Sequence, residues 1–578
     1  MIARWQAFAC ALAGYVVVAG VMLAPITNFR HLDSAVYGGD TRLNAWAVAW
    51  VNHAILDRAP VFDANIFFPS QNTLAYSEHL LGISLFALPV YALTRNAALS
   101  YNVMWLLSYL ACALSGYALA CRVTRDRFAS WVGGLAYAFC FYRMLHGHAH
   151  LQLLWTCWIP LSLLGLERWW REPSWTRLLQ LWVVVLLQVL TSWYLAVMVL
   201  LADAVFTIWL AIRLRPKPDR WRLMSLQMAS ALGAGAVLVW PIARRYMFLV
   251  SLNGQNPAEA LGGSMAWRDL VVPPLNTWLG QWLSHHSRMA PPLIWGEKTL
   301  FLGYVTLALG ALGLWTAWQP TFQPTWRLTS HDVTPQEQSD RTLWLGFMSL
   351  LCLAAVAFAV GPSAEAVAKR SFDWTPFGLL GAVPGMSLFR VPARFVQLLT
   401  LGLSVLAATG AAWLHARFGR SGRLLTVLLV PVMLGEWYLV DFPGGAPQPE
   451  RMPVIYRQLA QIPARAVVSL PEYIGGPEWF IEADYQYYAT VHWHPIVNGY
   501  SRTEPPGYVK RLALISTFPS RASADALRAI GADYLVLHTK RYREGAEARV
   551  KAALASPEFA LTSQSGSDYL FHVLPARP

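Results

Sequence analysis

Long apolar runs dominate the hydrophobic pattern of this 578-residue chain. Several of them reach or approach the roughly 20 residues that an α-helix needs to cross a bilayer. We predict eleven transmembrane helices, at 1–25, 98–121, 128–145, 149–167, 176–192, 193–212, 224–243, 298–318, 343–361, 394–415 and 424–441. The pattern therefore predicts a polytopic α-helical membrane protein.

Two apolar stretches need a separate decision. The run 1–25 has the basic start of a signal peptide but no clear small-residue cleavage site, so we interpret it as the first transmembrane helix. The stretch 80–94 is short and contains Pro89, so we interpret it as a re-entrant or interfacial segment. If it crossed the membrane, every later loop would change sides.

The composition agrees with a membrane protein. Hydrophobic residues make up 56% of the chain and charged residues only 13%, whereas soluble chains carry about 25% charged residues. The 13% aromatic content is also the opposite of a disordered composition. An ordinary soluble enzyme and a disordered protein are both excluded.

The positive charge lies between the apolar runs. The net charge is +13, of which residues 441–578 contribute only +1. Basic connections near 122–127, 168–177, 213–222 and 417–423 are typical of cytoplasmic loops. This predicts a cytoplasmic N-terminus and a periplasmic C-terminal domain. Membrane orientation therefore accounts for the positive charge, and binding to nucleic acid is not predicted. The aromatic-rich, arginine-rich composition favours a bacterial inner membrane.

The resulting domain plan has a transmembrane domain, 1–440, followed by a Pro-rich linker, 441–453, and an outer domain, 454–578. Three long outer loops interrupt the first domain, at 28–80, 244–297 and 362–392. The outer domain has predicted strands at 466–471, 533–539 and 569–574, with a helix at 521–531 before the second strand. It is therefore predicted as a small extracytoplasmic α/β domain.

The first outer loop contains the segment GGDTRLNAW, in which Asp40 follows two glycines. The helix-like run after it places Trp46 and Trp50 on one face with His53 nearby, as in a helix lying along a membrane surface. A carboxylate at the mouth of a membrane cavity is a candidate general base or metal ligand. The alternative is that Asp40 only caps the helix.

Other candidate residues lie at predicted outer ends of helices. In FYRMLHGHAHLQ, alternating histidines follow Arg143 and form a weak metal motif; the alternative is a polar helix end. Glu297 begins the span at 298. Arg390 and Arg394 flank the turn before the span at 394, where two arginines can grip a phosphate; the alternative is anchoring to lipid headgroups.

Several segments together resemble the YfhO-like bacterial membrane proteins, which are grouped with the GT-C glycosyltransferases. They are GGDTRLNAW, FYRMLHGHAHLQLLWTCWIPL, ERWW, EKTLFLGYV, MSLFRVPARF, HPIVNGYSRTEPPGYV and IGADYLVLH, and the resemblance covers roughly residues 1–540. It implies a GT-C-like fold and transfer of a sugar from a polyprenyl-phosphate donor to an extracytoplasmic acceptor.

In such enzymes an acidic residue of the first outer loop is the base or a metal ligand, and Asp40 matches that position. Many relatives carry a second acidic residue in a DxD pattern, whereas this chain has Asp40, Thr41 and Arg42. This departure favours an inverting displacement that needs no metal, with Mg²⁺ or Mn²⁺ as an option, and no metal ligand is assigned.

The predicted roles follow from this hypothesis. The catalytic group comprises Asp40, which activates the acceptor, with Glu297 and His148, which orient the substrate; the alternative is that these two bind a metal. The predicted substrate-binding residues are Arg390, Arg394, Arg143, Asn44, Trp46, His146 and His53. The predicted partners are a polyprenyl-phosphate sugar, an extracytoplasmic glycan, lipid or protein acceptor, and membrane lipids.

Two other classes of function stay open at this point. A transporter or flippase of lipid-linked saccharides needs polar groups deep within its spans, where Gln188 and Asp203 are the main candidates. A non-catalytic scaffold would bind an envelope polymer through its outer domain. The aromatic residues of that domain have two predicted roles, stacking on sugars or packing against the membrane. They are Trp479, Tyr485, Tyr487, Tyr488 and Trp493.

Overall fold

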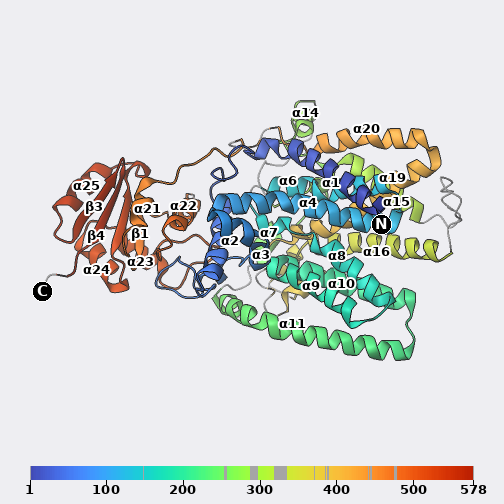
Figure 1. Cartoon of the computed structure of the whole chain (residues 1–578), viewed down its shortest axis with the longest axis horizontal. Coiled ribbons are helices and arrows are strands. Elements are labelled where there is room, and N and C mark those ends of the chain that lie inside the picture. Colours follow the sequence, from blue (N-terminus) through green and yellow to red (C-terminus); the bar gives the residue numbers. More distant parts are fainter. Residues whose placement is uncertain are drawn as a thin grey trace. The chain divides into compact units, whose positions relative to one another are not determined.

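The computed structural model describes residues 2–147, 149–252, 257–286, 297–317, 335–369, 372–383, 386, 389–440, 442, 445–473 and 478–576. Contacts divide the chain into two compact units (Figure 1). The helical unit comprises Met1–Thr27 and Trp105–Ala446. The mixed unit comprises Asn28–Met104 and Pro447–Pro578, so that the first predicted outer loop groups with the C-terminal part of the chain.

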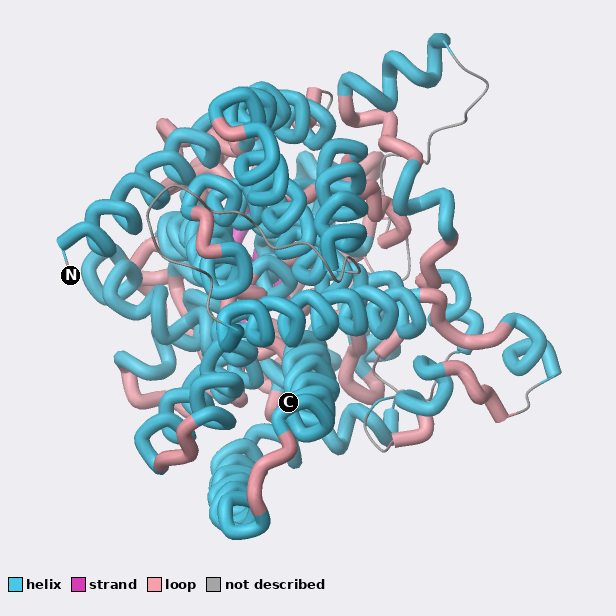
Figure 2. Tube along the Cα trace, turned by 90° about the vertical axis from the view of Figure 1, so that its right-hand side faces the viewer, coloured by secondary structure: helices cyan, strands magenta, loops and turns pink. Residues whose placement is uncertain are grey.

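Most of the described chain is helical, as Figure 2 shows with all helices in cyan. Within the described residues, six helices are long and apolar enough to cross a membrane, and the chain is accordingly a multi-pass membrane protein. These six spans are Trp5–Met22, Ala97–Thr124, Trp193–Leu214, Pro218–Leu249, Gln338–Lys369 and Pro392–Phe418. The predicted number of eleven is not confirmed, although shorter apolar helices accompany the six.

The helices of the helical unit range from single short turns to long spans. In chain order, their bounds are α1 Ile2–Met22, η1 Ala24–Ile26, α4 Ala97–Thr124 (which starts in the mixed unit), α5 Arg127–Ala138, α6 Phe141–His146, α7 Leu151–Leu154, α8 Trp158–Arg171, α9 Trp175–Thr191, α10 Trp193–Leu214, α11 Pro218–Leu252, α12 Pro257–Gly262, α13 Trp267–Val271, α14 Trp278–His286, α15 Tyr304–Ala317, α16 Pro335–Ala359, α17 Ala364–Lys369, α18 Pro376–Gly381, η4 Pro392–Phe395, α19 Val396–Phe418 and α20 Arg420–Trp437.

The prediction of two continuous helices at 128–145 and 149–167 is wrong. The structure breaks this region into α5, α6, α7 and α8. Arg143 explains how the breaks are tolerated, because its buried guanidinium donates hydrogen bonds to the carbonyls of Ala138, at 2.9 Å, and Leu154, at 2.6 Å. Both carbonyls belong to the last residue of a short helix, where the helix itself supplies no donor.

Helix α19 forms the core of the helical unit, packing against α15, α5 and α16. In the apolar 18-residue window of the span Pro392–Phe418, 94% of the residues are buried, against 11% in that of Pro218–Leu249 in α11. Small residues permit the close approach of α15 and α19. A Cβ atom at Gly313 would lie 2.0 Å from the carbonyl oxygen of Leu406, and one at Gly410 would lie 2.1 Å from that of Leu309.

The mixed unit contains one four-stranded sheet in the order β1-β2-β4-β3. Strand β1 (Val467–Leu470) is parallel to β2 (Tyr534–His538), and the hairpin of β3 (Phe559–Ser565) and β4 (Asp568–Val573) adds antiparallel to β2. The three predicted strands are therefore confirmed. Strand β3 was not predicted, because its FALTSQS sequence is mostly polar and largely exposed.

The helices of the mixed unit come from both ends of the sequence. Their bounds are α2 Asp40–Leu56, η2 Thr73–Tyr76, α3 Leu81–Thr94, α21 Val454–Leu459, η5 Trp479–Ile481, α22 Glu482–Tyr488, η6 Ala489–Val491, α23 Tyr508–Ile515, α24 Arg521–Ile530, η7 Thr539–Arg541 and α25 Ala546–Ala555. Helix α24 confirms the predicted helix 521–531. Backbone hydrogen bonds join the two parts of the unit, such as Phe67 N to Asn498 O and Ile496 N to Asn65 O.

Helix α3 has both ends in contact with the segment that precedes it. At its start, the His79 ring lies beside Phe62, and just after its end the Asn96 side chain donates to the carbonyl of Asp33 at 2.9 Å. Its 14 residues extend about 21 Å, less than the roughly 30 Å of a bilayer core. The re-entrant or interfacial placement of this helix stays a prediction. The membrane sides of the predicted domains stay a prediction.

Candidate functional site

Asp40 is the first residue of α2, and a residue of the C-terminal part holds its carboxylate. The N-cap position belongs to Gly39, whose φ of 59° suits glycine, and no side chain caps the helix. The alternative in which Asp40 serves as the N-cap is therefore not observed. Instead, the hydroxyl of Tyr500 donates a hydrogen bond to Oδ1 of Asp40 at 2.7 Å.

Arg42, two residues further on, is held by two carboxylates. Its Nη1 lies 2.6 Å from Oδ1 of Asp484, and its Nη2 contacts Glu450. Asp484 also accepts from Arg541 at 2.9 Å, and Tyr488 donates to Glu450. This network of alternating charges fixes the start of α2 to α22 and to the segment around residue 450.

The remaining predicted residues of α2 are mostly packed within the mixed unit. Asn44 donates to the backbone oxygen of Asp40 at 2.8 Å. Trp46 is fully buried and donates to Asn65 at 3.0 Å, and Trp50 donates to the carbonyl of Val61 at 2.7 Å. The expectation of an aromatic face lying on a membrane surface is wrong, because protein covers that face. Substrate binding by Asn44 and Trp46 stays a prediction that these contacts disfavour.

A second cluster lies in the helical unit and joins Glu297 to Arg394 and His146. Oε2 of Glu297 lies 3.1 Å from Nε2 of His146, and Nε of Arg394 lies 3.1 Å from Oε1 of Glu297. The Arg394 guanidinium also lies over the ring of Tyr194, 4.8 Å from its centroid. Burial alone would raise the pKa of Glu297, but Arg394 and His146 hold that pKa well below its usual range.

The two arginines predicted to grip phosphate are thus each paired with a glutamate. Arg390 donates to Glu259 at 2.6 Å and is more exposed than Arg394, which pairs with Glu297. The buried Arg143 donates hydrogen bonds to backbone carbonyls. This supporting role disfavours its predicted role in substrate binding. His148 lies outside the described residues.

The outer-domain aromatic residues divide into two groups. Tyr485, Tyr487 and Tyr488 are buried by the protein itself, so their burial supports neither stacking on a sugar nor packing against the membrane. Trp479 is partly exposed and its ring lies 4.5 Å from that of Tyr500. The Trp493 ring stacks on His53 at 4.2 Å between centroids.

Sequence reasoning missed Tyr500 and the partners of Arg42. Tyr500 occurs in the NGYSRTEP segment that carries part of the family resemblance, but nothing in its spacing relates it to Asp40. Among the described residues, no three His, Cys, Asp or Glu side chains gather as a metal site.

Comparisons with known proteins support the fold. No family model and no curated protein matches the sequence. The solved arabinofuranosyltransferase AftD from Mycobacteria is similar over 99% of this chain and 40% of its own, with a TM-score of 0.56 and 13% identity. This chain therefore spans about two fifths of the AftD chain.

Two further similar structures are more distant. The oligosaccharyltransferase AglB from Archaeoglobus fulgidus has a TM-score of 0.46 and 11% identity over 92% of this chain and 69% of its own. ArnT from Cupriavidus metallidurans, bound to undecaprenyl phosphate, has a TM-score of 0.40 and 13% identity over 99% and 98%. The likeness to AftD shows that the two chains share a fold. Membership of the GT-C glycosyltransferases and the closer resemblance to YfhO-like proteins stay predictions.

Proposed function

We propose that this protein is a membrane glycosyltransferase that moves a sugar from a polyprenyl-phosphate donor to an extracytoplasmic acceptor. The fold shared with AftD across 99% of the chain supports the class of reaction. A bacterial inner membrane, a cytoplasmic N-terminus and a periplasmic C-terminal domain belong to the same proposal. The reaction proceeds with inversion and uses Asp40 as the base.

The hydrogen bond from Tyr500 to Asp40 is the observation that carries the proposal. A hydroxyl that donates to a carboxylate favours the charged form and fixes its orientation. A charged, oriented carboxylate can take the proton of an acceptor hydroxyl. The acceptor oxygen then attacks the anomeric carbon of the donor, and the polyprenyl phosphate leaves with the electron pair of the broken bond.

The cluster in the helical unit is proposed to serve the donor. Arg390, the more exposed of the two arginines, grips the phosphate, and Arg394 adds positive charge toward the leaving group. Glu297 and His146 act as positioning residues for Arg394: Glu297 contacts its guanidinium, and His146 contacts Glu297. His148 keeps its proposed role in orienting the substrate.

The transporter hypothesis gains no support from the polar residues within the spans. Asp203 accepts a hydrogen bond from Ser162 at 2.9 Å, and Gln188 donates to the carbonyl of Trp155 at 3.1 Å. Both side chains thus satisfy neighbouring groups of the protein.

The test uses the full chain in nanodiscs with a panel of radiolabelled polyprenyl-phosphate sugars. Release of polyprenyl phosphate is followed for the native chain and for Asp40→Asn, with and without a chelator. Asp63→Asn is the matched control, since Asp63 is an exposed carboxylate of the same loop. We expect turnover that Asp40→Asn reduces at least about 100-fold and that Asp63→Asn leaves unchanged. Donor binding without turnover by the native chain would contradict the proposal, and chelator sensitivity would establish a metal.

A further inference from the structure

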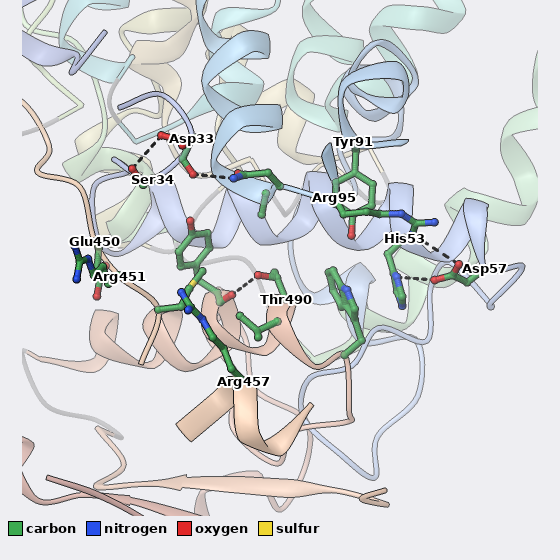
Figure 3. A pocket seen from close by; sticks show the side chains of 16 residues that line it. Asp33, Ser34, His53, Asp57, Tyr91, Arg95, Glu450, Arg451, Arg457 and Thr490 are labelled. Atoms are coloured by element: carbon green, nitrogen blue, oxygen red, sulfur yellow. Dashed lines mark hydrogen bonds and ion pairs between the residues drawn. The ribbon is translucent and has the colours of Figure 1, made fainter. Parts of the chain in front are cut away.

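A pocket of about 640 Å³ lies within the mixed unit (Figure 3), and Asp40 is not among its lining residues. Its volume falls in the range of roughly 300–1,000 Å³ typical of small-molecule sites. Its walls come from the end of α2, from the junction of α3 and α4, and from the segment around residues 450–457 with Trp493. Three distant parts of the sequence therefore build one cavity.

One wall of the pocket is aromatic and is held in a strained conformation. Trp493 has a φ of 58°, in the left-handed region that a bulky residue rarely adopts. Its ring lies nearly parallel to that of His53, with an interplanar angle of 9°. Such strain persists only where the surrounding structure fixes it, and it is common at ligand clamps. Aromatic faces of this kind also provide the flat apolar surface on which the C–H face of a sugar ring packs.

The pocket is lined by three carboxylates, of Asp33, Asp57 and Glu450, and by the guanidinium groups of Arg95, Arg451 and Arg457. Asp33 accepts a hydrogen bond from the Ser34 hydroxyl at 3.1 Å. Asp57 lies 2.7 Å from His53 and 3.7 Å from Arg95, so its charge is balanced within the protein. Glu450 is engaged by Arg42 and Tyr488.

Arg451 and Arg457 line the same cavity, and neither forms an ion pair with any residue that the structure describes. The two side chains are also exposed. Guanidinium groups bind carboxylates and phosphates through paired hydrogen bonds. The pocket thus combines an aromatic wall with cations suited to an anionic group.

The pocket extends along α2 toward the residue proposed as the base. Figure 3 shows Glu450 and Arg451 at one end and His53 and Asp57 at the other. Glu450 contacts Arg42, which follows Asp40 by two residues, whereas His53 lies near the end of α2. Arg42 and His53 are separated by about 17 Å along the helix axis. An extended ligand in the pocket would therefore have one end directed toward the start of α2.

We propose that this pocket binds an anionic saccharide segment of the acceptor, and the proposal rests on the proposed glycosyltransferase function. Trp493 packs against a sugar ring, and Arg451 and Arg457 bind its carboxylate or phosphate substituents. The pocket accordingly selects an acidic glycan over a neutral one and presents the acceptor toward Asp40.

The test measures binding rather than turnover. Equilibrium dialysis with the full chain in nanodiscs of zwitterionic lipid compares labelled trigalacturonate, glucose 6-phosphate and the neutral maltotriose. The variants are Trp493→Ala, the double variant Arg451→Gln/Arg457→Gln and the control Arg521→Gln, which removes an exposed arginine outside the pocket. Arg451 and Arg457 are exposed, so the double variant should fold and still test the proposal if Trp493→Ala does not fold.

We expect at least one anionic probe to bind at least tenfold more tightly than maltotriose. The double variant should lose at least tenfold in that affinity, and Arg521→Gln should lose none. The stronger of the two anionic probes identifies carboxylate or phosphate as the recognised group. Equal binding of neutral and anionic probes, no binding of either anionic probe, or an unchanged double variant would overturn the proposal.

Asp40→Asn separates this proposal from the proposed function. It should retain trigalacturonate or glucose 6-phosphate affinity, because Asp40 does not line the pocket. Binding without any turnover would then refute the transferase alone, whereas turnover with an unaffected double variant would refute the pocket alone.

Discussion

The hydroxyl of Tyr500 donates a 2.7 Å hydrogen bond to Oδ1 of Asp40, although 460 residues separate the two in sequence. The contact lies within one compact unit, built from the first predicted outer loop and the C-terminal part of the chain. The orientation of the proposed base therefore depends on the C-terminal part.

Tyr500→Phe should reduce kcat while leaving the KM for the donor unchanged. The phenyl ring keeps the packing beside Trp479 but loses the hydrogen bond that orients Asp40. We expect a loss of about tenfold, because one neutral-to-charged hydrogen bond contributes about 1.5–3 kcal/mol. Tyr569→Phe, on strand β4, is the matched control in the same assay. A Tyr500→Phe enzyme with native kcat would show that the hydrogen bond has no part in turnover.

Arg394→Gln should destabilise the helical unit. The substitution leaves Glu297 without its main counter-charge, and breaking a buried ion pair costs about 3–5 kcal/mol. Glu297 is 25% exposed, so we expect a value near the lower end, about 3 kcal/mol. Arg390→Gln breaks a pair whose side chains are 39% and 38% exposed, and it should cost less than about 1 kcal/mol. Thermal melting of the two variants in nanodiscs compares them, and equal shifts would contradict the assignment.

The titration of Glu482 should lower the stability of the mixed unit as pH rises from about 4.3 to about 8. Burial raises the pKa of Glu482 to about 8, even though Asn498 and the Tyr473 amide donate to its carboxylate. The unfolded glutamate ionises near pH 4.3, while the folded one stays protonated. The contribution of the protonated group is therefore complete below pH 4.3, is lost as pH rises through the folded pKa, and changes little above it.

The measurement is the melting temperature of the full chain between pH 4 and pH 9. The native protein should lose stability across this window relative to Glu482→Gln, which carries no titrating group there. Glu478→Gln is the control, since Glu478 is 45% exposed and should follow the native curve. Parallel curves for the native chain and Glu482→Gln would refute the assignment.

Gly410→Ala should separate α15 from α19 and destabilise the helical unit by about 1–3 kcal/mol. The added methyl group would lie 2.1 Å from the carbonyl oxygen of Leu309, so one helix must move. Gly233→Ala places the same methyl group on α11, where no atom lies within 4 Å. Thermal melting should distinguish the two, with Gly233→Ala unchanged or slightly more stable because alanine favours a helix. Similar melting of both variants would show that the close approach is not needed.

The sequence by itself determined the class of the protein and many of its elements. Long apolar runs predict membrane helices because the length of a span follows from the thickness of the bilayer. The segments containing β1, β2 and β4 were predicted because their apolar, β-branched residues are local signals of a buried strand. Asp40 was a candidate because its motif and its place after the first apolar run can be seen without a structure.

The tertiary structure alone decided how the site residues are paired. Arg394 meets Glu297 across 97 residues, and Tyr500 meets Asp40 across 460, which no helical or strand periodicity encodes. It also decided that α5 to α8 are separate helices, because the guanidinium of Arg143 satisfies carbonyls at two helix ends. Periodicity records which face of an element is apolar. The partner of a charged or polar side chain is set instead by which distant segments pack together, since burial requires that each such group be satisfied.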